Sequence, residues 1–154
     1  MNQFRNLVEG AYNSFRTADH LAYVSYPLLK DKRLLLVITQ NLYMAGVKCV
    51  DALLYYERLY KRLNIVPAEF NSRMQIFRKI VAPRYKINES VVNIVNDLHL
   101  LGKQHKESPI EFFRKDKLVI CSDGYSSIKT VDIELLKSYI SEMRNFLGVV
   151  KNLK

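Results

Sequence analysis

The sequence predicts a mainly α-helical fold: a bundle of about five helices around one long central helix, with a small β-hairpin before the last helix. Apolar residues recur at alternating steps of three and four from Arg33 to Leu63, a spacing that places them along one side of a helix. Only five glycines and four prolines occur in 154 residues, which favours long helices with few turns. The period changes between Ile110 and Ser122, where short runs typical of strands occur. No repeat or linker divides the chain, so we expect one domain spanning residues 1–154.

The first predicted helix runs from about Gln3 to Ser25. We expect Pro27 to close it, because proline disfavours a helical conformation in the residue before it. The polar link Lys30-Asp31-Lys32 then leads into the central helix. So short a link makes the first two helices antiparallel neighbours.

The central helix, Arg33 to Leu63, carries two apolar stripes on different sides, so its neighbours must cover it from more than one direction. Both stripes are committed to packing, and we identify no polar cluster that faces inward. We therefore expect this helix to be scaffold, and any function to lie on the elements that it supports. One stripe consists of Leu35, Ile38, Leu42, Ala45, Cys49, Ala52, Tyr56, Leu59 and Leu63, and the other of Leu36, Tyr43, Val47, Val50 and Leu54.

Two further helices are predicted before the strands. Pro67 is well placed as the first residue of a third helix, which runs to about Val81 and ends at Pro83. Asn88 is the predicted cap of a fourth helix, and Ser108-Pro109 stops it.

The strand-like segments are Ile110 to Arg114 and Leu118 to Ser122, with a turn at Asp123-Gly124 after them. A lone hairpin is only marginally stable in water, so we expect its apolar side chains to pack on the bundle. Thr130 is the predicted cap of the last helix, whose apolar stripe runs from Ile133 to Val150.

Composition restricts the classes of function. The formal net charge of +9 and the pI near 9.6 attract polyanions such as RNA, DNA or an acidic protein, although solubility alone also accounts for such a charge. Cys49 and Cys121 form no CxxC pair, which favours a reducing compartment over a disulfide framework. The N-terminus has no apolar signal segment, and the longest aliphatic run, Leu34 to Ile38, is too short to span a bilayer. We therefore expect a cytoplasmic protein without a membrane segment.

Basic residues gather in two places. The segment from Arg73 to Lys86 holds five positive charges and no acid, and it straddles a predicted helix end, where cationic side chains can follow a phosphate backbone. Phe77 and Tyr85 could offer stacking faces to single-stranded bases, or Phe77 could belong to the core. The candidate nucleic-acid-binding residues are Arg73, Arg78, Lys79, Arg84 and Lys86. A second cluster, diluted by Glu107, Glu111 and Asp116, consists of Lys103, Lys106, Arg114, Lys115 and Lys117.

Histidines are the candidate catalytic residues, because imidazole titrates near neutral pH and can act as a general acid or base. His105 continues the apolar phase of the fourth helix, so it should face a neighbouring helix or a subunit interface. His99 lies beside that phase, with Asp97 as a nearby carboxylate, whereas His20 has no evident activating neighbour. The alternative role for His105 is packing. The histidines lack the i, i+4 pairing of a metal site, so we expect no metal, and no motif indicates a cofactor.

Three features together resemble HEPN domains, small helical domains named for higher eukaryotes and prokaryotes nucleotide-binding. They are the hairpin of the first two helices, the segment Cys49-Val-Asp-Ala-Leu-Leu-Tyr-Tyr-Glu-Arg58, and the polar helix end before the last helix. The resemblance covers most of the chain and is one of pattern. It implies a helical protein that forms a homodimer. In many members it also implies an RNase, whose motif is an arginine followed a few residues later by a histidine, contributed by both subunits.

The RNase motif is incomplete in this sequence. His105 could take the histidine position, but no arginine lies between Asn88 and His105. Without it, the stabilisation of a phosphate transition state is not evident. We therefore expect a non-catalytic basic helical module that binds RNA or a macromolecular partner. The alternatives are a metal-independent HEPN-type RNase that uses His105 with His99, and a structural, antitoxin-like protein-interaction partner.

Overall fold

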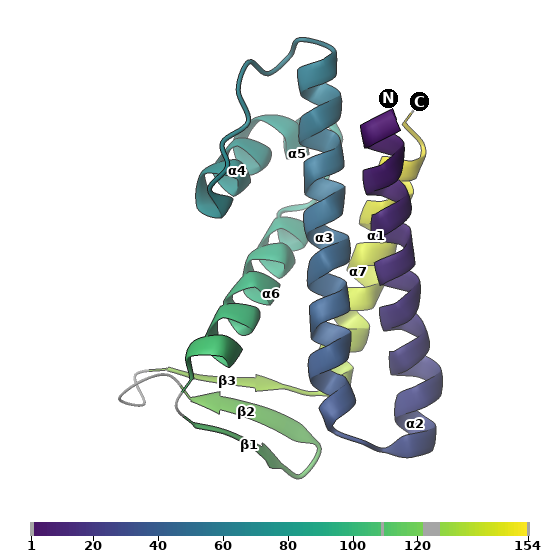
Figure 1. Ribbon diagram of the computed structural model, residues 1–154, viewed down its shortest axis with the longest axis vertical. Coiled ribbons are helices and arrows are strands. Elements are labelled where there is room, and N and C mark those ends of the chain that lie inside the picture. Colours follow the sequence, from purple (N-terminus) through teal and green to yellow (C-terminus); the bar gives the residue numbers. More distant parts are fainter. Residues whose placement is uncertain (1, 109, 122–126, 154) are drawn as a thin grey trace.

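The computed structural model describes residues 2–108, 110–121 and 127–153. It confirms a mainly α-helical fold with a small antiparallel sheet before the last helix. Figure 1 shows the long helix α3 at the centre, with α1 and α7 on one side, α6 on the other and the sheet at one end. The helices are α1 (Asn2–His20), α2 (Tyr26–Leu29), α3 (Arg33–Leu59), α4 (Phe70–Ile76), α5 (Ala82–Arg84), α6 (Glu89–Glu107) and α7 (Ile133–Lys151).

The two helices predicted to end at a proline instead continue through it. A π-helical turn, Leu21–Ser25, joins α1 to α2, and a second, Phe77–Val81, joins α4 to α5. Each turn lies just before a proline, Pro27 or Pro83, which occupies the first positions of the next helix. The wider turn shifts the backbone in front of the proline ring, which would clash with the preceding turn of a regular α-helix. The prediction that a helix ends at either proline was therefore wrong. The described helices form five continuous helical segments, here called rods: α1–α2, α3, α4–α5, α6 and α7.

Other helix boundaries also differ from the predicted ones. Glu69 caps α4 by accepting hydrogen bonds from two backbone N–H groups, so this helix begins later than Pro67. Asp132, not Thr130, caps α7 by accepting from the N–H of Leu135. Asn88 does occupy the N-cap position of α6, without a side-chain hydrogen bond.

The central helix ends at Leu59, earlier than the predicted Leu63. Lys61 adopts a φ of 60°, and the N–H of Arg62 returns to the carbonyl of Glu57 at 2.8 Å. This is the hydrogen-bond pattern of a Schellman motif, here with lysine in the left-handed position that glycine usually takes. The apolar spacing continues past the helix end, which is why the sequence pattern overestimates its length.

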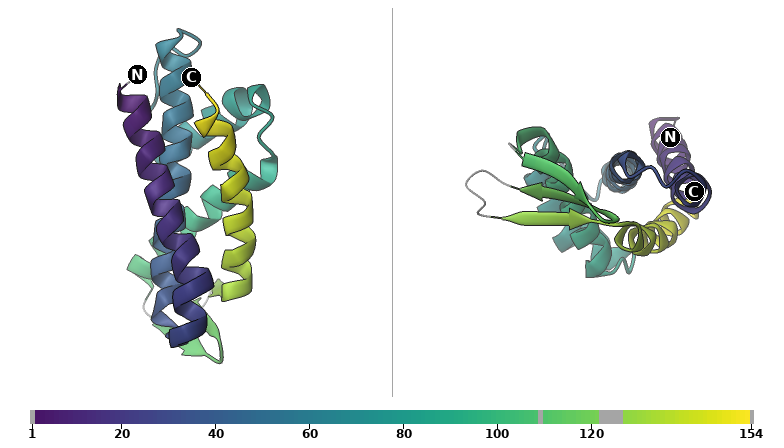
Figure 2. Two further views of the ribbon diagram at one scale, coloured as in Figure 1. Left: turned by 90° about the vertical axis from the view of Figure 1, so that its right-hand side faces the viewer. Right: turned by 90° about the horizontal axis from the view of Figure 1, so that it is seen from below.

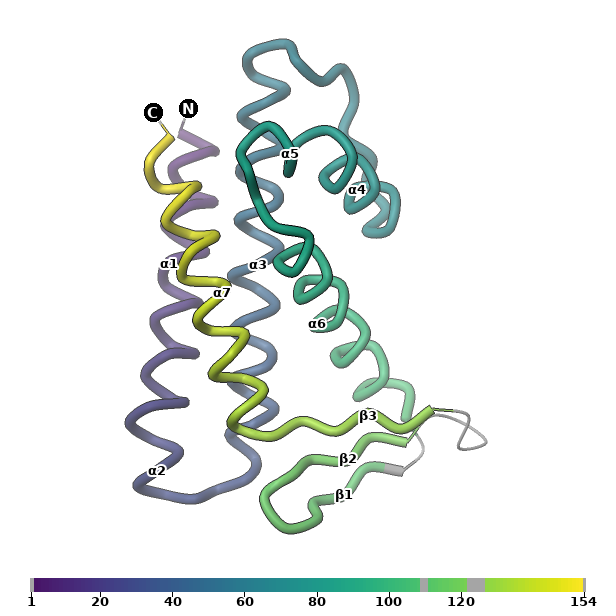
Figure 3. The backbone as a smooth tube through the Cα atoms, turned by 180° about the vertical axis from the view of Figure 1, so that it is seen from behind, coloured from purple at the N-terminus to yellow at the C-terminus, as the bar shows by residue number. Residues whose placement is uncertain are grey.

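The predicted hairpin is confirmed and gains a third strand. Strands β1 (Ile110–Arg114), β2 (Lys117–Cys121) and β3 (Ile128–Val131) form an antiparallel sheet in that order. Figure 3 shows β3 leading directly into α7, so this short strand merges with a helix start and gives little signal of its own. The turn predicted at Asp123-Gly124 lies outside the described residues.

The inner face of the sheet packs on the bundle, as predicted. Leu118, Ile120 and Val131 are buried in the same core as the helices. Lys129, on the same face, lies 3.4 Å from the carboxylate of Asp97 on α6. Figure 2 shows the sheet crossing the end of the molecule, with its other face turned away from the helices.

Close packing around α3 depends on Gly46. A Cβ at this position would lie 3.1 Å from Val95 on α6 and 3.5 Å from Met143 on α7. Both neighbouring helices therefore approach α3 at a residue without a side chain. The first apolar stripe is buried as predicted from Leu35 to Ala52, but Leu59 is exposed. The second stripe is less completely packed than predicted, because Leu36, Tyr43 and Val47 are only half-buried.

Of the described helices, only α3 is long and apolar enough to cross a membrane, by length and composition alone. The aliphatic run Leu34 to Ile38, taken alone, did not predict that the whole helix is long and apolar enough to cross a membrane. The core helix of a soluble protein meets the same criterion, and α3 packs against α1, α6 and α7.

Candidate functional site

A buried carboxylate near the end of α3 holds one of the predicted nucleic-acid-binding residues. Glu57 is fully buried and accepts hydrogen bonds from Arg62, Arg84 and the hydroxyl of Tyr85. The Arg62 contact measures 3.0 Å. Burial and the Glu57 carboxylate raise the pKa of Tyr85 far above its usual value, so the hydroxyl stays a donor. The expectation that α3 carries no inward polar cluster was therefore wrong.

Two more predicted cations are also paired. Arg73 forms an ion pair with Asp51 on α3. The Nε of Arg78 lies 3.1 Å from a carboxylate oxygen of Glu89, and its Nη2 donates to Asn93 at 3.0 Å. These arginines attach the α4–α5 rod to α3 and α6, which partly neutralises their charges.

The rest of this segment offers a nucleic acid two exposed lysines but no fully exposed aromatic face. Lys79 and Lys86 are exposed, and neither is paired with a described residue. Phe77 is fully buried and packs near Phe146 at 5.9 Å between ring centroids, so the core alternative for this residue is confirmed. The hydroxyl of Tyr85 is bound to Glu57 and its ring packs partly against the core, so less of the ring is open to a base.

The second basic cluster, Lys103 to Lys117, differs from the first in its ion pairing. Within the described part of the chain, none of its five cations forms an ion pair. Glu111, one of the acids that dilutes the cluster in the sequence, is instead bound to His105. The cations of the second cluster therefore keep their charge available, and all five are exposed: Lys103, Lys106, Arg114, Lys115 and Lys117.

Strand register gathers part of this cluster on the outer face of the sheet. Phe112 pairs across β1 and β2 with Val119, and Arg114 pairs with Lys117, so these four side chains share one face. Phe112 is 43% exposed and Ile128, on β3, is 59% exposed. A hollow of about 540 Å³ lies on this face and is lined by Phe112, Arg114, Lys115, Lys117, Val119, Cys121, Ile128 and Thr130. The run Ile110 to Arg114 predicts a strand, but its apolar residues do not alternate with polar ones. Only the register shows which residues share the face.

His99 is held by aromatic neighbours. Its Nδ1 lies 3.2 Å from the hydroxyl oxygen of Tyr43, and its ring stacks on Phe70 with 3.8 Å between centroids and 13° between planes. Burial, and then the charge of Lys103, lowers the pKa of His99, which favours the neutral ring at pH 7. Its use as a charged acid is therefore disfavoured.

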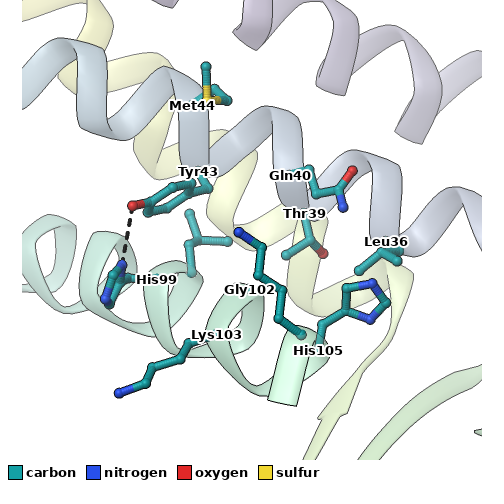
Figure 4. Close-up of a pocket in the computed structure, with 11 residues that line it drawn as sticks. Leu36, Thr39, Gln40, Tyr43, Met44, His99, Gly102, Lys103 and His105 are labelled. Carbon is teal, nitrogen blue, oxygen red and sulfur yellow. Dashed lines mark hydrogen bonds between the residues drawn. The ribbon is translucent and has the colours of Figure 1, made fainter. Parts of the chain in front are cut away.

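His105 does face a neighbour, as predicted, but the neighbour is a strand. Its Nδ1 lies 2.6 Å from a carboxylate oxygen of Glu111 on β1, and the side chain is partly exposed. His99 and His105 are six positions apart, yet both line one pocket between α3 and α6. Figure 4 shows this pocket with the Tyr43 to His99 hydrogen bond at one end and His105 at the other.

The pocket lacks the groups expected of an RNase or a metal centre. No arginine is among its lining residues, so the described pocket lining does not supply the phosphate-stabilising group that is missing from the sequence motif. In the described part of the chain, no group of three or more histidine, cysteine, aspartate or glutamate side chains is placed to hold a metal ion.

Comparison with protein-family models, with curated proteins and with solved structures found no match to this chain. The resemblance to HEPN domains therefore stays a prediction from the sequence pattern.

Proposed function

We propose that the protein binds single-stranded RNA through the outer face of its sheet, as a non-catalytic basic module of the cytoplasm. The observation that carries this proposal is an exposed aromatic ring, Phe112, beside three cations that form no ion pair with a described residue, Arg114, Lys115 and Lys117. Single-strand binders combine these two elements, because bases stack on aromatic faces while cations follow the phosphates.

The geometry suits an extended single strand better than a duplex. The hollow on the outer face is lined by the buried Val119 and by the exposed apolar side chains of Phe112 and Ile128, against which a base can be removed from water. Arg114 and Lys117 face each other at the strand ends, so two positive charges lie together beside these apolar side chains. Like charges in cross-strand contact are unfavourable for folding, and an anion between them relieves the repulsion.

A paired charge reversal tests the proposal. The variant carrying Arg114→Glu and Lys117→Glu keeps a like-charge pair, so the cross-strand electrostatics within the fold are unchanged in sign. The variant carrying Lys79→Glu and Lys86→Glu changes the net charge equally in the segment first predicted to bind RNA. Lys115 stays unchanged in both variants, so that each variant reverses two charges.

Fluorescence anisotropy with a labelled single-stranded oligouridine gives the readout. We expect the sheet variant to lose about tenfold or more in affinity, and the slope of log K against log salt to fall by about 1.4, since each phosphate contact to a single strand contributes about 0.7. The control variant should change affinity by less than about threefold. Equal losses in the two variants, or no loss in the sheet variant, would refute the proposed interface.

The same reactions show whether the RNA is cut. We expect intact RNA, because the Nδ1 of His105 is engaged by Glu111 and no arginine lines the pocket with it. Cleavage that His105→Ala abolishes would instead support the metal-independent RNase.

A further inference from the structure

The pocket between α3 and α6 is separate from the outer face of the sheet and has the dimensions of a small-molecule site. Its volume is about 470 Å³, and such sites usually measure roughly 300–1,000 Å³. Figure 4 shows Leu36, Thr39 and Tyr43 of α3 facing α6 across it. The lining residues are Leu36, Thr39, Gln40, Tyr43, Met44, Leu98, His99, Gly102, Lys103, His105 and Lys106.

The apolar part of this lining is mainly aliphatic. Leu98 forms a fully buried floor, Leu36 is half-buried, and Met44 is 44% exposed. Gly102 leaves a gap in the wall, because a Cβ at this position would meet no atom within 4 Å. Tyr43 is the one phenylalanine, tyrosine or tryptophan among the lining residues, and its hydroxyl is bonded to His99. Flexible aliphatic walls suit an alkyl chain better than a planar ring.

The polar part of the lining carries one sign of charge. No aspartate or glutamate is among the lining residues, whereas Lys103 and Lys106 are, and neither is in an ion pair with a described residue. Lys106 lies in the last turn of α6, where its charge offsets the negative end of the helix dipole. Lys103 extends from α6 away from α3 in Figure 4, and rotation about its long flexible stem would bring the ammonium group to a ligand at the opening.

We propose that this pocket binds a medium-chain alkyl carboxylate. The chain lies against Leu36, Met44 and Leu98, and the carboxylate lies at the opening beside Lys103 and Lys106. Binding removes from water the alkyl chain and the exposed Met44 side chain together, and the lysines select an anion over a neutral alcohol of equal length.

Two glycines make a matched test. Gly102→Leu places an isobutyl group in the pocket and favours the α-helix, because glycine is the weaker helix former. Gly148→Leu is the control: this residue also lies in a long helix, its Cβ would also meet no atom within 4 Å, and it is not among the residues that line the pocket. Circular dichroism and thermal unfolding of both variants establish that the fold is retained.

Isothermal titration with decanoate measures binding. We expect saturable binding with one site per chain, unchanged in Gly148→Leu and weakened more than about tenfold in Gly102→Leu, since loss of contact to even two methylene groups has an effect of that size. Absence of decanoate binding to the unaltered protein, or equal affinity in the two glycine variants, would overturn the proposal.

The lysines are tested separately. The variant carrying Lys103→Gln and Lys106→Gln should bind decanoate about fivefold more weakly and bind decanol as the unaltered protein does. Equal effects on both ligands would show that the lysines do not select the anion and would refute this part of the proposal. The Arg114→Glu and Lys117→Glu variant should bind decanoate normally, which separates this site from the RNA interface.

Discussion

The buried carboxylate of Glu57 gives the sharpest test of how this fold is held together. It lies on α3, and its three partners come from the loop after α3 and from the α5 region. Glu57→Gln keeps the size and one carbonyl acceptor but removes the charge. Arg62 and Arg84 then lose their counter-charge, while the hydroxyl of Tyr85 keeps an acceptor.

The size of the effect follows from the burial of each partner. Loss of one member of a buried ion pair commonly costs about 3–5 kcal/mol, because the remaining charge stays desolvated. Here the side chains of Arg62 and Arg84 are 44% and 42% exposed, so water can solvate them after the change. We therefore expect a loss at the lower end, about 3 kcal/mol, which is a large part of the usual stability of about 5–15 kcal/mol.

Urea unfolding followed by circular dichroism at pH 7 measures this loss. Glu9→Gln is the control, because Glu9 is exposed on α1 and forms no ion pair with a described residue. It should change the free energy of unfolding by less than about 0.5 kcal/mol. A loss below about 1 kcal/mol in Glu57→Gln would show that the charge of Glu57 does not hold the α5 region to α3.

Three further predictions concern packing and titration. Gly46→Leu should destabilise the protein by about 2 kcal/mol or more in urea unfolding, since its side chain would meet Val95, whereas Gly148→Ala should stabilise it by about 0.5–1 kcal/mol; similar effects would contradict the packing at Gly46. Because burial lowers the pKa of His99 below 6.5, the unfolded chain takes up the proton more readily. The His99 contribution to stability is therefore full above pH 6.5 and lost as the pH falls toward the folded-state pKa. In urea unfolding at several pH values, His99→Gln should reduce the slope of the free energy of unfolding against pH in this range. Burial raises the pKa of Cys49 to about 12, so iodoacetamide should label this thiol only after unfolding, which mass spectrometry measures; labelling in the native protein would refute its burial.

Several features of the fold could be predicted from the sequence because they depend on local periodicity. The three-and-four spacing of apolar residues over Arg33 to Leu63 is a property of one segment, and it gave the central helix without knowledge of its neighbours. The change of period predicted the strand Ile110–Arg114, and it predicted a second strand from Leu118 where the structure has Lys117–Cys121. The two prolines were misjudged, because accommodation by a π-helical turn leaves no mark in the apolar spacing.

The candidate sites depended on contacts between distant segments. A count of charges placed the basic surface at Arg73 to Lys86, but it could not show that Arg84 meets Glu57, which is 27 positions earlier in the chain. Strand register, and not composition, gathers Phe112 with Arg114 and Lys117 on one face.

The sequence by itself thus determined which segments are helices or strands and which side of each is apolar. Only the tertiary structure decided which charges are neutralised, and that His99 and His105 share a pocket. The physical reason is distance: periodicity acts between neighbours along the chain, whereas ion pairs and pockets form only where folding brings separate segments within a few ångströms.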